Sequence, residues 1–107
     1  MITAYRVGAE REDMGIVQIE NTLEAFQEVV EGYIEVTALP DFEDISVKLI
    51  CNEEGLIHGL HVNENMLPYF FVGNLLIVAV DDEEFVSLTD DQKDAIDSFF
   101  ALLWQID

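Results

Sequence analysis

One run, residues 75–80 (LLIVAV), most constrains the fold. It is six consecutive apolar residues in a chain whose formal net charge is −19. It is bounded by Asn74 on one side and Asp81 on the other. A short apolar run of this kind is typical of a strand that is covered on both of its faces. We therefore predict that residues 75–80 form the centre of a sheet.

Shorter segments elsewhere combine apolar, β-branched and aromatic residues in the alternating pattern of strands. We expect the turn Asn52-Glu53-Glu54-Gly55 to join two of these segments as a hairpin, and residues 8–15 to form a polar connection. The predicted strands cover residues 2–7, 16–19, 33–39, 45–51, 56–62 and 84–88.

Two segments show the period and the capping signals of helices. Asn21, with Glu24 three residues later, predicts a capping box at the start of a helix over residues 22–31, which Gly32 ends. Thr89 and Gln92 predict the same motif before a helix over residues 90–104. The chain is expected to be one α+β domain, residues 1–107, with a mostly antiparallel mixed sheet of about five to seven short strands. Both helices should pack on this sheet.

The charge of the chain limits its partners. Only four basic residues face 23 acidic ones, so most carboxylates must be solvated. Nucleic acid and anionic membranes would repel such a surface, which leaves cationic partners. The lone Cys51 permits no internal disulfide, and the first residues do not resemble a signal peptide. These features indicate a cytoplasmic protein that binds neither nucleic acid nor membrane directly.

No group of residues has the pattern of a catalytic or metal site. His58, His61 and Glu64 are the best metal candidates, but in an extended segment residues three apart point to opposite faces. The chain has no glycine-rich phosphate loop and no serine in a nucleophile-elbow context. We therefore expect no metal, no cofactor and no enzymatic activity. A small-molecule site or enzyme with a pocket lined by the two histidines is a third, weaker interpretation.

The acidic residues near the C-terminus show a more specific pattern. On the second predicted helix, Asp90, Asp94 and Asp97 are spaced to share one face, and Lys93 is placed to pair with Asp97. Four more acids directly precede this region, so one end of the molecule could carry a ridge of carboxylates. The candidate partner-binding residues are Asp81, Asp82, Glu83, Glu84, Asp90, Asp94 and Asp97.

The amount of charge is comparable with that of DNA. Duplex DNA carries one charge per roughly 1.7 Å, so a net charge of −19 corresponds to about 32 Å of duplex. A compact chain of this length has a radius of gyration of about 13 Å, or a diameter of about 33 Å. The charge per length is thus similar, although a solubilising surface or a salt-rich cytoplasm would also explain it.

Three stretches resemble a known family. They are NTLEAFQEVVEGYIE (residues 21–35), LICNEEG (49–55) and GNLLIVAVDDEEFVSLTDDQ (73–92). Together they are similar to a domain-of-unknown-function family, number three-eight-four-six, of small proteins from phages, plasmids and conjugative elements. The resemblance implies an accessory protein of a mobile genetic element. Such proteins often inhibit host restriction or CRISPR enzymes, and several unrelated inhibitors are acidic DNA mimics.

Two main hypotheses follow. In the first, the chain is a non-enzymatic binding protein whose carboxylates occupy the nucleic-acid groove of a basic, nucleic-acid-binding protein. In the second, it is a structural or regulatory interaction module that uses an apolar patch at Tyr69, Phe70 and Phe71, and the acids serve solubility alone. The sequence leaves the oligomeric state open.

Overall fold

The computed structural model describes residues 1–10 and 13–105 of the chain. The polar connection predicted for residues 8–15 includes positions 11 and 12, which lie outside the described residues. The elements, in chain order, are β1 (Ile2–Val7), β2 (Met14–Ile19), α1 (Leu23–Val30), β3 (Ile34–Thr37), the 3-10 helix η1 (Pro40–Ile45), β4 (Val47–Asn52), the 3-10 helix η2 (Glu64–Met66), β5 (Leu75–Asp81), β6 (Glu84–Val86) and α2 (Asp90–Trp104).

The strands form one six-stranded sheet in the order β2-β1-β5-β4-β3, and β6 pairs with the end of β5. Every pairing is antiparallel. The predicted α+β class is confirmed, as is the position of β5 at the centre of the sheet. β3 is the last strand at one end of this order, so its outer edge is free of strand pairing in the described chain.

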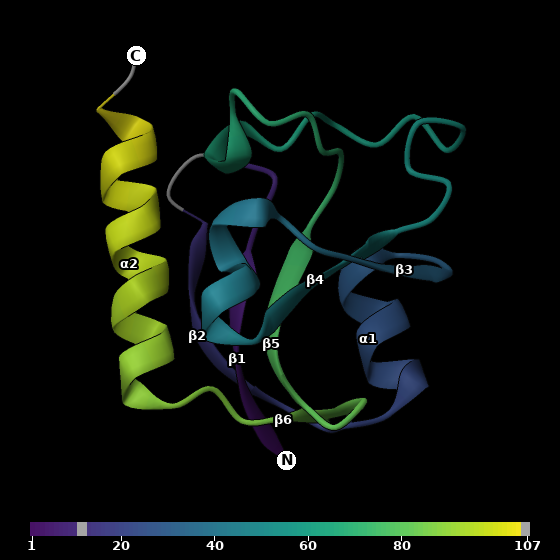
Figure 1. The fold of residues 1–107 in the computed structure, drawn as a ribbon. Helices are drawn as coiled ribbons and strands as arrows, with labels where there is room; N and C mark the ends of the chain where they lie inside the picture. Colours follow the sequence, from purple (N-terminus) through teal and green to yellow (C-terminus); the bar gives the residue numbers. More distant parts are fainter. Residues whose placement is uncertain (11–12, 106–107) are drawn as a thin grey trace.

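The two helices cover opposite faces of the sheet (Figure 1). Leu75, Ile77 and Ala79 of β5 pack in the same core cluster as the apolar face of α2. Leu76 and Val78 pack in a second cluster with α1. The alternation of a strand sends successive side chains to opposite faces, and here both faces are buried. This arrangement explains why β5 is apolar without interruption.

The molecule has the dimensions expected from its length. Its radius of gyration is 12.9 Å and its longest extent is 34 Å. Since a net charge of −19 corresponds to about 32 Å of duplex, the charge per length of the folded chain is similar to that of DNA.

The predicted start of the first helix was wrong by one residue. Thr22, not Asn21, is the N-cap, because its Oγ1 accepts a hydrogen bond of 3.2 Å from the N–H of Ala25. The amide of Asn21 instead donates to the carbonyl of Phe85 at 2.9 Å. The helix ends at Val30, and Glu31 caps it in the left-handed conformation with φ 64°. Gly32 follows it for another reason: a Cβ there would lie 2.6 Å from the amide nitrogen of Asn52.

One predicted strand is absent, and another begins two residues later than predicted. The segment predicted as a strand from residue 45 begins only at Val47, because η1 extends to Ile45 and Ser46 takes a left-handed conformation. Residues 56–62 form no strand; local bonds such as Leu60 N–H to Gly55 carbonyl, 3.0 Å, fold them into turns. Gly59, with φ 70°, prevents a continuous extended path. One isolated bridge joins Val62 to Val72. The other strands differ from prediction only in length.

Candidate functional site

The first acidic group lies at the turn between β5 and β6, residues 81–84, here called the acidic turn. Asp81 pairs with Glu84 across the hairpin, which leaves Asp82 and Glu83 as a two-residue loop. Both loop residues have positive φ, 51° and 73°. This is the backbone of a type I′ turn, for which Asn-Gly is the favoured sequence. All four side chains are exposed, and no described cation forms an ion pair with them.

The second group, here called the acidic helix face, consists of Asp90, Asp94 and Asp97 on α2. The predicted capping box is confirmed: Thr89 Oγ1 accepts from the Gln92 N–H, and Gln92 Oε1 accepts from the Thr89 N–H. All three aspartates are exposed. Two of them have partners within the molecule, which distinguishes this group from the acidic turn.

The partners observed for Asp90 and Asp97 differ from the one predicted. Lys93 pairs with Asp90, at 3.0 Å, so the expected pairing of Lys93 with Asp97 was wrong. Asp97 Oδ1 instead accepts a hydrogen bond of 3.0 Å from the hydroxyl of Tyr5 in β1. Burial, and secondly this hydrogen bond, raises the pKa of Tyr5 from 10.0 to about 12. Asp97 therefore joins α2 to the sheet.

The acidic turn and the acidic helix face lie on different parts of the molecule. Figure 1 shows the acidic turn below α1, whereas α2 rises from the other end of β6. Phe85, next to the turn, packs edge-on against Phe26 of α1, with ring centroids 5.6 Å apart. The acidic helix face belongs to the helix on the opposite face of the sheet. The seven predicted residues therefore form two separate groups, one of four residues and one of three.

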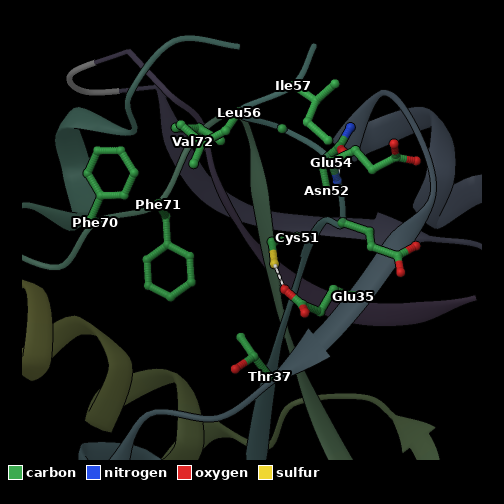
Figure 2. A pocket seen from close by; sticks show the side chains of 12 residues that line it. Glu35, Thr37, Cys51, Asn52, Glu54, Leu56, Ile57, Phe70, Phe71 and Val72 are labelled. Atoms are coloured by element: carbon green, nitrogen blue, oxygen red, sulfur yellow. Dashed lines mark hydrogen bonds between the residues drawn. The ribbon is translucent and has the colours of Figure 1, made fainter. Parts of the chain in front are cut away.

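A cleft of about 390 Å³ lies at the other end of the sheet, beside edge strand β3 (Figure 2). We call it the edge cleft. Its apolar rim is exposed: Leu56 is 68%, Ile57 80% and Phe70 62% accessible. It is lined by Glu35 and Thr37 of β3, Cys51 and Asn52 of β4, and segments 53–57 and 70–72.

The patch predicted at residues 69–71 is divided by the structure. Only Phe70 is exposed; Phe71 is partly buried against the core, and Tyr69 packs on Phe99 with ring centroids 6.1 Å apart. Sequence reasoning missed Leu56 and Ile57, because it assigned them to a strand. The signal that could have identified them in the sequence is a pair of adjacent apolar residues directly after the turn at Gly55.

Cys51 lies at the wall of the cleft and is buried, with 5% of its surface accessible. Its Sγ donates to Oε1 of Glu35 at 3.7 Å, the dashed contact in Figure 2. Burial, followed by the charge of Glu35, raises the pKa of the thiol to about 11. The thiol therefore stays protonated at neutral pH, as a donor to Glu35.

Comparison with known families is decisive for residues 2–102, which match the model of a domain of unknown function, DUF3846. The chain belongs to the DUF3846 family. No curated protein and no solved structure matches it significantly.

The histidines of this DUF3846 protein lie apart from both acidic groups. His58 lines a shallow hollow with Gln27 and Tyr33, and His61 lines a different one with Glu10 and Glu64. Over residues 1–10 and 13–105, no three His, Cys, Asp or Glu side chains are grouped closely enough to hold a metal ion. In the same residues, no helix has the length and apolarity needed to cross a membrane.

Proposed function

We propose that this DUF3846 protein is a non-enzymatic, cytoplasmic binding protein of a mobile genetic element. Its carboxylates occupy the cationic groove of a basic, nucleic-acid-binding host protein, so that it acts as a DNA mimic. Restriction and CRISPR enzymes are the class of target that the family setting suggests. The acidic turn is the observation that carries the proposal.

The backbone of the acidic turn supports a role for its charge. Asp82 and Glu83 occupy two left-handed positions, for which Asn-Gly and Asp-Gly are the favoured sequences. Aspartate tolerates this conformation, whereas Glu83 costs about 1–2 kcal/mol relative to glycine. Four adjacent carboxylates also repel one another. A turn selected for stability alone would avoid both costs. Binding to a cationic surface accounts for acids at these positions.

The overall charge supports the same class of partner. A net charge of −19 on a molecule 34 Å long gives a field that attracts basic proteins and speeds their encounter. Carboxylates at an exposed hairpin tip can enter a groove that normally holds phosphates. Such binding weakens steeply with salt, because exposed charges are screened beyond a Debye length of about 10 Å at 0.1 M salt.

Displacement of DNA tests this proposal directly. A short fluorescent duplex is bound to each of a panel of purified restriction nucleases and CRISPR effectors, and the DUF3846 protein is titrated in while anisotropy is followed. We expect release of the duplex from at least one target. The affinity of the DUF3846 protein for that target should fall at least tenfold between about 0.05 and 0.2 M salt. Failure to displace DNA from any of them at low salt, or an affinity of the DUF3846 protein for its target that does not change with salt, would reject DNA mimicry.

The exposed rim of the edge cleft favours a second candidate function. Phe70, Leu56 and Ile57 form an accessible apolar group, as expected for a structural or regulatory interaction module. In that case the acids only keep the protein soluble. Substitution of Phe70 would then abolish partner binding, whereas charge neutralisation at the acidic turn would leave it intact.

A further inference from the structure

We infer that the edge cleft is a docking site for an extended segment of a basic partner protein, in which an apolar side chain is flanked by lysine or arginine. The inference rests on the proposed function only for the charge of the partner. The acidic turn contacts a cationic groove, and the edge cleft would hold a separate segment of the same protein.

The register of the edge strand shows how such a segment can be held. Glu35 pairs with Cys51 and Thr37 with Leu49, and both β4 residues face the α2 side of the sheet. Glu35 and Thr37 therefore face the cleft. Because β3 ends the strand order, an extended segment can add to its outer edge through backbone hydrogen bonds. Every second side chain of that segment would then point into the cleft.

The rim provides the apolar part of the site. Leu56, Ile57 and Phe70 are each more than 60% accessible, while Phe71 and Val72 behind them are partly buried. Figure 2 shows Phe70 and Phe71 on one side of the opening, and Leu56 and Ile57 at its upper margin. A cavity of about 390 Å³ can take an anchoring side chain of the kind that dominates binding energy at interfaces.

Charge selects the kind of segment. Glu35, Glu53 and Glu54 line the cleft, and the described lining residues include no lysine or arginine. The protonated thiol of Cys51 donates to Glu35 and holds its carboxylate at the cleft wall. A second copy of this chain would bring another net charge of −19 and be repelled, as would an anionic membrane. A cationic segment is attracted both by the glutamates of the cleft and by the net charge of the chain.

Three fluorescent decapeptides provide the probes. In the first, every second residue is serine, and the positions between carry arginine and leucine in turn, so that both point to the same face of an extended chain. Serine replaces leucine in the second peptide, and glutamate replaces arginine in the third. We expect the first to bind at least tenfold more tightly than the other two, since only it satisfies both parts of the cleft. Equal binding of the first two would exclude the apolar anchor, and equal binding of the first and third would exclude charge selection.

Matched variants locate the binding. Phe70→Ser should weaken the arginine–leucine peptide at least tenfold, whereas Leu102→Ser, at a residue of α2 that is 64% accessible, should change it less than twofold. Ile57→Ser, at a residue that is 80% accessible, serves as a second variant should the first unfold. Unchanged binding by folded Phe70 and Ile57 variants would overturn the inference. So would a dimer, seen by sedimentation, that Phe70→Ser dissociates, since a second copy would then be the occupant.

The same measurements separate this inference from the proposed function. Displacement of duplex DNA without Phe70-dependent peptide binding would reject docking at the edge cleft and leave DNA mimicry in place. Phe70-dependent peptide binding without displacement of DNA from any tested protein would reject DNA mimicry alone.

Discussion

The acidic turn and the acidic helix face look alike in the sequence and differ in the structure. Both are exposed groups of carboxylates close to β6. In the helix face, Asp90 pairs with Lys93 and Asp97 accepts a hydrogen bond from Tyr5. In the turn, no described cation pairs with any of the four acids, and the left-handed backbone of Glu83 is strained.

This difference shows that charge density in a sequence does not measure the charge available to a partner. Part of the helix face stabilises the fold, and its ion pair reduces the local negative charge. The acidic turn keeps its full charge at the tip of a hairpin.

The helix that carries the acidic helix face should contribute to stability through core packing, whereas the acidic turn should not. Ile96 lies on the core-facing side of α2 and is fully buried, so Ile96→Ala should lower the free energy of unfolding by about 2–5 kcal/mol. Denaturant unfolding measures this loss. Leu102→Ala, on the exposed side of the same helix, is the control and should cost less than about 0.5 kcal/mol. Equal losses would mean that α2 does not pack as described.

Neutralisation should affect partner binding more strongly in the turn. The turn variant carries Asp81→Asn, Asp82→Asn, Glu83→Gln and Glu84→Gln, and the helix variant carries Asp90→Asn, Asp94→Asn and Asp97→Asn. In the duplex-displacement assay we expect the turn variant to lose at least tenfold in affinity and the helix variant about threefold, because two of the helix acids already have partners. A larger loss from the helix variant would reverse the comparison.

The hydrogen bond of Asp97 should be visible in stability. Tyr5→Phe should lower the free energy of unfolding by about 1–1.5 kcal/mol at neutral pH. Because the pKa of Tyr5 is raised from 10.0 to about 12, the folded protein holds this proton where the unfolded chain has lost it. The stabilising contribution is therefore complete below pH 10 and is lost as the pH rises to about 12.

Denaturant unfolding of both proteins at several pH values checks this sign. The difference between wild type and Tyr5→Phe should shrink as the pH rises from 9 to about 12. The comparison of the two proteins cancels the similar effect of Cys51, which both retain. A difference that stays constant with pH would show that burial and the hydrogen bond to Asp97 do not raise the pKa of Tyr5.

The strain of the turn should appear as a small gain on its removal. Glu83 has φ 73°, so Glu83→Gly should raise the free energy of unfolding by about 0.5–1 kcal/mol. Thermal or denaturant unfolding measures the gain. Glu84→Gly, in the paired strand β6, is the control and should destabilise instead. A loss at Glu83 would show that the left-handed turn carries no strain.

Elements with two agreeing signals were predictable from the sequence. β5 combined an apolar run with flanking polar residues, and α2 combined a capping box with helical period; both were located within one residue of their observed bounds. The cap of α1 was predicted one residue too early, at Asn21, because the side chain of Thr22 can accept the first hydrogen bond equally well. The side chain of Asn21 instead donates a hydrogen bond to the carbonyl of Phe85, which is distant in the sequence.

The edge cleft was not predictable in the same way. Leu56 and Ile57 resemble strand residues in isolation, and only the turns around Gly59 turn them toward solvent. Glu35 and Phe70 are far apart in the sequence. Their common position depends on the pairing of β3 with β4 and on the return of the chain after η2.

The α+β class, the buried central strand, both helices and the excess of negative charge follow from local pattern and composition, so they could be predicted before the fold was known. Which carboxylates have partners, and which apolar residues stay exposed, could be seen only in the folded molecule. Those outcomes depend on contacts such as Tyr5 with Asp97, between residues that are distant in the chain and meet only when the sheet forms.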